Sequence, residues 1–183
     1  APLQEEIQHV IKEKTSNGML RHYRESLNTM VYETLTTPLG GPFGDCRLTD
    51  IQPSQSMPEL GFEMGLGGQL KNIRVTSIGK ILQQFLSPED PLARYAGLLC
   101  SPAFDIPVGG LLTGSVDAVL GLPGSQPDNP RLAICDYKSN RLHSLGVLDP
   151  LQAYAPERLI DAMVGHHYPL QALLYGTALF RML

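Results

Sequence analysis

Two side chains of opposite charge, Asp136 and Lys138, stand two residues apart in the segment ICDYKSN. Because side chains of a β-strand alternate between its two faces, a strand here places the carboxylate and the ammonium on one side. The four residues before Asp136, from Leu132 to Cys135, are all apolar, which predicts a strand that is buried on both faces. An ionisable pair at the end of such a strand is costly unless it is paired or binds a metal ion.

A third candidate residue, Asp117, lies in the segment TGSVDAVLG. The alternation predicts strands over 110–122 and 131–138, joined by the turn-rich PGSQPDNP as a hairpin. A suitable register brings Asp117 beside Asp136, although the sequence does not fix that register. Two adjacent carboxylates repel each other, and a hard divalent cation such as Mg²⁺ or Mn²⁺ relieves the repulsion.

Such a cation would polarise a phosphodiester and lower the pKa of a bound water, so that metal-dependent hydrolysis is the chemistry expected of this group. Lys138 would orient or help deprotonate the water, or hold the phosphate as a point charge. From spacing alone, a metal or catalytic role for the aspartates and an ordinary surface role remain equally open.

The elements that must position these residues are predicted from periodicity and from helix stop signals. The first 36 residues read as two helices, a strand covers 57–66, a helix capped by Thr76 or Ser77 runs through Leu86, and a short helix follows it. Helices are also expected over 148–164 and over 168–182, the latter with Pro169 in its first turn. In the second helix, apolar residues recur at three- and four-residue steps and should face inward: Leu20, Tyr23, Leu27, Met30, Val31 and Leu35. The fold class predicted is α/β, with a central mixed sheet flanked by helices.

The composition fits one domain spanning residues 1–183, because 43% of the 183 residues are hydrophobic and 17% are charged. No stretch reaches the ~18 apolar residues of a membrane span, and no signal peptide is recognisable, so a soluble cytoplasmic protein is expected. A net charge of −4 argues against a domain that grips nucleic acid through a large basic face. Cys46, Cys100 and Cys135 are too scattered for a disulfide framework or a zinc knuckle.

Taken together, these motifs resemble the PD-(D/E)XK nucleases of the RecB type. The likeness consists of G-x-x-D, a hairpin, an apolar run that ends in D-Y-K-S-N, and then HHYPLQALLYGTALFRML with its Tyr, Gln and Tyr on one helical face. Upstream, ELGF at 59–62 resembles the glutamate-containing strand of the family, and the helical segment ending in TTPL resembles the stretch before that strand. The similarity is strongest from Thr113 to Leu183.

The resemblance implies the restriction-endonuclease-like fold of these enzymes and a set of site residues. Asp117 and Asp136 would bind the metal and Lys138 would be the catalytic lysine. Four further residues would support the site and contact DNA: Gln171, Tyr175, Tyr168 and Glu59. The alignment leaves Glu63 as an alternative to Glu59. The cofactor implied is Mg²⁺, with Mn²⁺ able to substitute.

One departure from the family concerns the metal-binding histidine, which such nucleases carry in an early helix. His9 and His22 lie in predicted helices, but the sequence around them lacks the family's pattern. The chain is therefore expected to be a fragment that lacks the upstream metal-binding helix and the terminal strands of the domain. The resemblance therefore leaves open whether the isolated fragment is active.

The parent implied by the resemblance is an exodeoxyribonuclease of the RecBCD type, an enzyme of double-strand break repair and recombination. Its ATP-driven helicase would deliver single DNA strands to this domain, and RecC-like and RecD-like subunits would be partners. ATP would bind only in the helicase part, since no G-x-x-x-x-G-K-[ST] loop occurs here.

An alternative from another class is a catalytically idle domain that keeps the nuclease fold to bind DNA or another subunit. Intact Asp117, Asp136 and Lys138 argue against it, because an idle copy has no chemical reason to retain all three. An iron–sulfur relative is disfavoured, since a cluster needs four cysteine ligands and the chain has three.

Overall fold

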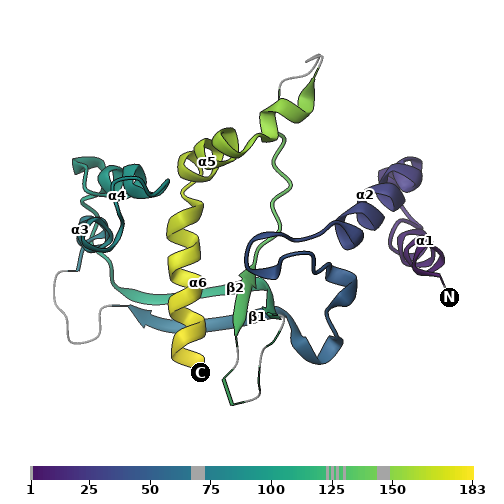
Figure 1. Ribbon diagram of the computed structural model, residues 1–183, viewed down its shortest axis with the longest axis horizontal. Coiled ribbons are helices and arrows are strands. Elements are labelled where there is room, and N and C mark those ends of the chain that lie inside the picture. The colour runs from purple at the N-terminus through teal and green to yellow at the C-terminus, as the bar shows by residue number, and fades with distance from the viewer. Residues whose placement is uncertain are drawn as a thin grey trace. The chain divides into compact units, whose positions relative to one another are not determined.

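A three-stranded sheet and six α-helices form the regular structure of the residues that the computed structural model describes, which are 2–66, 73–122, 124, 126, 128, 129, 131–143 and 149–183 (Figure 1). The strands are β1 (Ser56–Leu66), β2 (Gly110–Gly121) and β3 (Leu132–Cys135), and they pair in the order β1-β2-β3 as an antiparallel sheet. The α-helices are α1 (Leu3–Lys14), α2 (Arg24–Thr36), α3 (Val75–Phe85), α4 (Ala93–Leu99), α5 (Pro156–Gly165) and α6 (Tyr168–Met182). Short 3₁₀ turns occupy Met19–Tyr23, Gly41–Phe43, Leu48–Asp50, Pro53–Gln55, Pro102–Phe104 and Pro150–Tyr154.

The chain divides into two compact units, and β2 and β3 contribute residues to both. The first unit comprises Ala1–Met57 and Val119–Ala133, and the second comprises Pro58–Ala118 and Ile134–Leu183. Asp117, Asp136 and Lys138 all fall in the second unit, as do α3, α4, α5 and α6. Every predicted site residue therefore belongs to one body of the protein.

In the first unit, α1 and α2 form a pair whose connection is fixed by Arg24. Its guanidinium donates to the hydroxyl of Thr15 at 2.7 Å and to the carbonyl of Thr15 at 2.9 Å. Thr15 is itself buried and donates to the carbonyl of Ile11 at 2.6 Å, so the buried hydroxyl is satisfied on both sides. Ile7 and Ile11 of α1 are buried in this unit.

The predicted inward face of the second helix is wrong in part. Leu27, Val31 and Leu35 are half-buried, but Leu20, Tyr23 and Met30 are 58%, 56% and 56% exposed. Leu20 and Tyr23 precede α2 and lie in a 3₁₀ turn, whose three-residue period does not continue the α-helical stripe. The apolar periodicity thus predicted the helix correctly and overestimated how much of it is covered.

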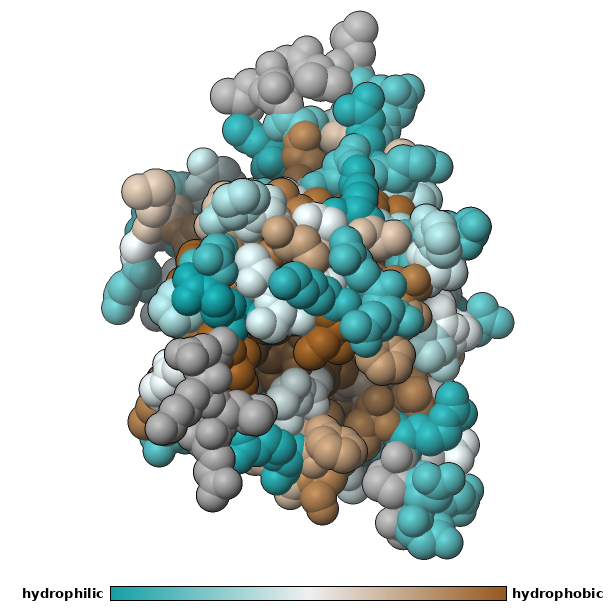
Figure 2. Space-filling view, turned by 90° about the vertical axis from the view of Figure 1, so that its left-hand side faces the viewer, coloured by the Kyte–Doolittle hydropathy of each residue, from teal (hydrophilic) through white to brown (hydrophobic). Residues whose placement is uncertain are grey.

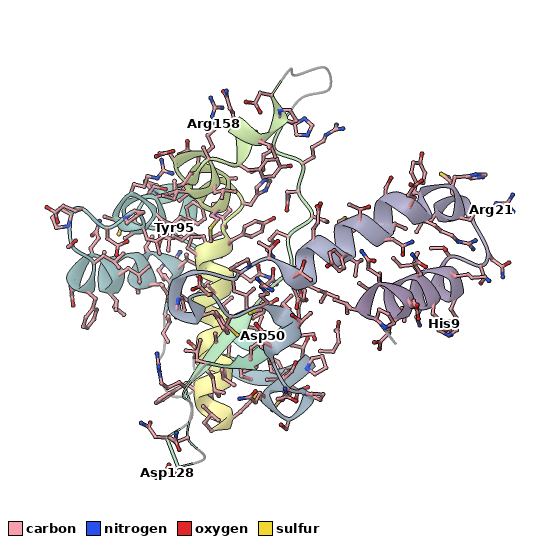
Figure 3. All side chains as sticks on the ribbon, turned by 45° about the vertical axis from the view of Figure 1, so that its right-hand side comes forward. His9, Arg21, Asp50, Tyr95, Asp128 and Arg158 are labelled. Carbon is pink, nitrogen blue, oxygen red and sulfur yellow. The ribbon has the colours of Figure 1, made fainter. Side chains whose placement is uncertain are left out.

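In the second unit, α3 and α4 pack closely because Gly79 of α3 carries no side chain. A Cβ placed there would lie 2.9 Å from the carbonyl oxygen of Ala96 and 2.9 Å from Cβ of Leu99, which is closer than atoms approach in proteins. Tyr95, Ala96 and Leu99 of α4 are completely buried, and Figure 3 shows Tyr95 among the side chains of this helix pair.

Helix α6 runs across the strands β1 and β2 (Figure 1). The ring of Tyr175 meets that of Phe62 edge-on, with centroids 5.8 Å apart, and Arg181 donates to the carbonyl of Gly65 at 3.2 Å. On the side of this unit that carries α3 and α4, apolar residues gather around a hollow (Figure 2). A cavity of about 550 Å³ between these helices and α6 is lined by Leu82, Leu86, Tyr95, Leu173 and Phe180, among others.

Most predicted elements are confirmed, including the helix over 168–182 with Pro169 in its first turn. The sheet is antiparallel among the described residues, so the expectation of a mixed sheet is corrected. The predicted helix over 148–164 is replaced by the turn Pro150–Tyr154 and by α5, because Pro156 disfavours helical geometry at Ala155 and has no N–H to donate.

Two predicted boundaries also change. Neither Thr76 nor Ser77 caps α3, which starts after Arg74 without a side-chain cap; the hydroxyl of Thr76 lies 3.4 Å from the carboxylate of Asp105 instead. The strand predicted over 131–138 ends at Cys135. Beyond that point the backbone N–H of Tyr137 bonds to a side chain rather than to a neighbouring strand. Part of the predicted hairpin turn, and the glycine run after Leu66, lie outside the described residues.

None of the helices within these described ranges combines the length and the apolar character that crossing a membrane requires. All three cysteines are free and half-buried, whereas the sequence led us to expect mostly buried thiols.

Candidate active site

Asp117 and Asp136 are brought together by the end of the β2–β3 hairpin. Asp117, half-buried on β2, accepts a hydrogen bond of 2.7 Å from the backbone N–H of Tyr137, the residue that follows Asp136. This bond fixes the register that the sequence leaves open, because it ties the first aspartate to the segment carrying the second. Burial, together with the negative charges of Cys135 and Asp117, raises the pKa of the Tyr137 phenol.

Asp136 and Lys138 form an ion pair between Oδ2 and Nζ. The side chain of Asp136 is 19% exposed, and its Oδ2 atom is shielded from solvent. Burial lowers the pKa of Lys138, but the hydrogen bond to Asp136 and the charge of that carboxylate raise it by more than burial lowers it. The pKa of Lys138 therefore lies above the ordinary lysine value. Lys138 is therefore an ammonium at neutral pH in this geometry, and it neutralises a carboxylate that would be expensive to leave alone.

Gln171 of α6 connects the members of this group through one side-chain amide. Its Oε1 accepts from Nζ of Lys138 at 2.8 Å, while its Nε2 donates to Oδ1 of Asp136 at 3.3 Å and to the hydroxyl of Tyr175 at 2.7 Å. Both ends of the amide thus have partners, and their chemistry fixes which end is oxygen. Gln171 holds the lysine and the aspartate in one arrangement.

Tyr175 is held in turn by the sheet. It lies one helical turn after Gln171, so the two side chains share a face of α6. Its ring packs against Phe62 of β1, and the Phe62 ring lies directly over Gly114 of β2, where a Cβ would come within 2.7 Å of the ring. The first residue of the G-x-x-D motif is therefore glycine for a packing reason.

Tyr168 contacts the same lysine from the start of α6. Nζ of Lys138 lies 4.2 Å from the centre of the Tyr168 ring, which is within the range of a cation–π interaction. The Tyr168 hydroxyl donates to Oδ1 of Asn140 at 2.8 Å, and the ring stacks on His166 with centroids 5.4 Å apart. Tyr168, Gln171 and Tyr175 therefore all belong to the cluster around Asp136 and Lys138. This agrees with the prediction that the three side chains share one face of the helix.

Glu59 lies apart from this cluster. Its exposed carboxylate is 3.5 Å from the hydroxyl of Ser115, and Ser115 stands two residues before Asp117 on the same face of β2. The backbone of Glu59 has a positive φ of 52°, which interrupts the regular alternation of β1. The structure thus places Glu59 toward the Asp117 side of the sheet and shows no bond from it to Lys138. Glu63 is exposed on the same strand.

No group of three or more His, Cys, Asp or Glu side chains suited to a metal ion occurs among the residues that the structure describes. The candidate donors are therefore the two carboxylates of Asp117 and Asp136. His9 lies in α1 and His22 in the 3₁₀ turn after it, both in the first unit, whereas the aspartates belong to the second.

Sequence reasoning missed three contributors to this site: Phe62, Asn140 and the backbone N–H of Tyr137. Phe62 is the last residue of the motif ELGF, and Asn140 is the last residue of the motif DYKSN. Membership in these motifs is the sequence signal that could have identified them. The role of a backbone amide is invisible in sequence, because every residue except proline has one.

The fold and the site together define an α/β protein in which an acidic pair, a charged lysine and a glutamine meet in one cluster. No protein-family model matches the chain. Relatives are found among curated proteins: RecBCD enzyme subunit RecB of Mycobacterium tuberculosis is 40% identical over 153 residues, which is 80% of this chain and 13% of that protein. The same subunit of Mycolicibacterium smegmatis is 36% identical over 152 residues, and that of Escherichia coli is 29% identical over 175 residues, or 94% of this chain.

Over most of its length the chain is thus homologous to the RecB subunit of RecBCD enzymes, and the resemblance seen in its motifs is confirmed at that level. The chain spans about 13% of the length of the curated relatives it matches.

Proposed function

We propose that this chain is the nuclease part of a RecBCD-type helicase–nuclease and that it hydrolyses DNA phosphodiester bonds with Mg²⁺ as cofactor. The observation that carries the proposal is the network in which Gln171 holds both Lys138 and Asp136 beside Asp117. Homology to RecB supports the same assignment, because the relatives are named as subunits of an enzyme complex.

The donor set fits Mg²⁺. Asp117 and Asp136 offer hard oxygen ligands, and Mg²⁺ is commonly held by one or two carboxylates, with waters and substrate phosphates filling its other positions. Mn²⁺ accepts the same ligands and would substitute. When bound, such an ion stabilises the charge of the transition state and lowers the pKa of a bound water.

The chain's own residues supply orientation and charge. Lys138, protonated in this geometry, would hold a phosphate oxygen or the attacking water by a charge-assisted hydrogen bond. Gln171 keeps its ammonium in place, and Tyr175 keeps Gln171 in place through the contact with Phe62. Tyr168 and Glu59 would lie along the path of the strand.

The setting in which this chemistry would operate follows from homology. In a RecBCD-type complex, a helicase would use ATP outside these residues to deliver single strands, and RecC-like and RecD-like subunits would be the partners. We propose a cytoplasmic location, because the DNA substrate is found there. The acidic balance of the chain suits this arrangement, because a delivered strand needs no capture by a basic surface.

The metal site is tested by calorimetry with Mn²⁺ on the chain and on its Asp117→Asn and Asp136→Asn variants, with circular dichroism as a check of folding. We expect the wild type to bind and both variants to lose most of the affinity. A Glu89→Gln variant removes an exposed carboxylate outside the candidate site and serves as the control. Absence of binding in the wild type, even after an upstream helix with a histidine is restored, would contradict the proposal.

Lys138→Ala separates metal binding from hydrolysis. Lys138 forms an ion pair with the carboxylate of Asp136 and would compete with a metal cation for that carboxylate. Removal of the lysine side chain should therefore leave the affinity for Mn²⁺ unchanged or higher. Hydrolysis by the helicase–nuclease that carries the change should fall by at least about 100-fold, the scale of losing one charged contact in a transition state. Lys80→Ala, which removes an exposed lysine of α3, should change neither measurement. Cleavage retained by Lys138→Ala would refute the role given to this residue.

A further inference from the structure

A cavity of about 420 Å³ opens directly beside Asp136 and Lys138. Its walls are mostly carbon: Ile134 at the end of β3, Leu142 on the following segment, and Leu159, Ala162 and Met163 of α5. Asp136, Lys138 and Gln171 supply charged and amide groups to its lining, and Asn140, Tyr154, His166, Tyr168 and Tyr175 add further polar or aromatic side chains. The proposed metal chemistry accounts for Asp136, Lys138 and Gln171, but it gives no role to the apolar chamber beside them.

Tyr154 holds the wall of the cavity that the segment after Lys138 forms. Its hydroxyl accepts from the backbone N–H of Leu142 at 3.3 Å and lies 3.5 Å from the carbonyl of Asn140. Asn140 is also held by the Tyr168 hydroxyl. The segment after Lys138 is therefore tied both to the turn Pro150–Tyr154 and to α6.

We propose that this cavity binds one unpaired nucleobase of the DNA strand, next to the phosphodiester held at Asp136 and Lys138. This inference rests on the proposed function, since it takes the phosphate at Asp136 and Lys138 as given. A base and its phosphate are joined through one sugar, so a phosphate at the mouth places the attached base at the chamber. Apolar and aromatic walls that also carry polar side chains suit a base, which offers flat hydrophobic faces and hydrogen-bonding edges.

Access to the chamber depends on the form of the DNA. A volume of about 420 Å³ lies within the range of ligand pockets and is ample for one base. A base in a duplex must leave its stack and its partner before it can enter, whereas a single strand offers bases that are already unpaired. The cavity therefore makes single-stranded DNA the better substrate through contact with a base as well as through delivery by a helicase.

The test compares two oligonucleotides with equal numbers of phosphates: (dT)₁₂ and a twelve-residue strand made only of abasic tetrahydrofuran units. The chain has seven tyrosines and no tryptophan, so tyrosine emission reports binding without a label. Titrations in Ca²⁺ at low salt, with gels to confirm that the strands stay intact, should show (dT)₁₂ binding about 5- to 100-fold more tightly, the range of one stacked base.

Ala162→Met fills the chamber without removing any contact of the charged cluster, and it should reduce the preference for (dT)₁₂ below about twofold. Ala103→Met adds the same side chain at an exposed position outside the cavity and should leave the preference unchanged. The wild-type comparison needs no variant, so it decides the matter even if Ala162→Met fails to fold.

Equal affinity for the two strands, or binding of neither, overturns the nucleobase site. Mn²⁺ calorimetry on the same preparation separates this failure from failure of the proposed function. If Mn²⁺ binds and is lost with Asp136→Asn while the two strands bind equally, only the nucleobase site is wrong. If Mn²⁺ also fails to bind, even when an upstream helix with a histidine is added, the proposed function is contradicted together with it.

Discussion

At the scale of single residues, the site is organised by an uncharged side chain. Asp136 and Lys138 neutralise each other, but an ion pair alone has no preferred direction, since a lysine ammonium is a compact charge on a flexible stem. Gln171 supplies the direction by bonding to both partners, and it is oriented by the Tyr175 hydroxyl. The Tyr175 ring in turn is positioned by Phe62, which gives the network a rigid support.

Tyr175→Phe tests whether this support matters to hydrolysis. The variant keeps the ring on Phe62 and removes only the hydroxyl that accepts from Gln171, so the free energy of unfolding should fall by about 1 kcal/mol. With Gln171 free to turn, kcat of the helicase–nuclease should drop about tenfold while KM for DNA stays within twofold, which corresponds to about 1.4 kcal/mol in the transition state. Tyr23→Phe, at a position that is 56% exposed, is the control. An unchanged kcat in Tyr175→Phe would show that Gln171 needs no support.

At the scale of elements, much of this structure could be predicted from the sequence, and the rest depended on tertiary contacts. Apolar periodicity located the helices, and the motif spacing placed Gln171 and Tyr175 on one face of α6, as the structure has them. The end of β3 was missed because it depends on the carboxylate of Asp117, twenty residues away, taking the N–H of Tyr137. The helix break before α5 was not predicted, although Pro156 in the sequence is a signal for it. The assignment of Asp117, Asp136 and Lys138 to catalysis remains a prediction.

Gly79→Ala probes the packing of α3 on α4. Alanine is normally the better helix former by about 1 kcal/mol, but the added methyl would meet the backbone of Ala96 and Cβ of Leu99 at 2.9 Å, where neither atom can easily move. The variant should therefore lose about 1–3 kcal/mol of stability in urea unfolding. Gly97→Ala on α4, where nothing lies within 4 Å, should be neutral or gain up to about 1 kcal/mol. Equal effects of the two substitutions would mean that the helices are not in this close contact.

The same helix pair predicts an alkaline loss of stability. Burial raises the pKa of the Tyr95 phenol, and a hydrogen bond with the backbone of Leu170 lowers it only in part. The pKa of this phenol is therefore higher in the folded chain than in the unfolded chain, where the ordinary tyrosine pKa of 10.0 applies. The stabilisation is complete below about pH 10 and is lost as the pH rises from there toward the folded pKa.

Urea unfolding between about pH 8 and pH 11 measures this loss. Tyr95→Phe should be less stable than the wild type at pH 8, since it gives up the contact of the hydroxyl with His167 at 3.4 Å, but its stability should fall less steeply above pH 10. Tyr23→Phe should follow the wild type throughout. Parallel curves for the wild type and Tyr95→Phe would contradict a buried, neutral Tyr95.

At the scale of the whole molecule, the charge and the site suit the proposed delivery of a DNA strand to the protein. The net charge of −4 gives the surface no general attraction for DNA, and the cavity beside Lys138 is the proposed site of one base. Under this proposal, affinity would come from the metal, one or two cations and one base. The chain spans about 13% of the length of its RecB relatives.

The last prediction concerns the salt dependence of binding by the isolated chain. Each phosphate of a single strand that is neutralised by a lysine or arginine contributes about −0.7 to the slope of log K against log salt. Lys138 and the exposed Arg141, three residues on, are the cations that the segment after β3 offers, so the slope for (dT)₁₂ should lie between about −0.7 and −1.4. Arg141→Ala should reduce its magnitude by about 0.7, whereas Arg21→Ala in the first unit should not change it. A slope near −4 would instead reveal a basic groove, and the strand would then be captured by this chain rather than delivered to it.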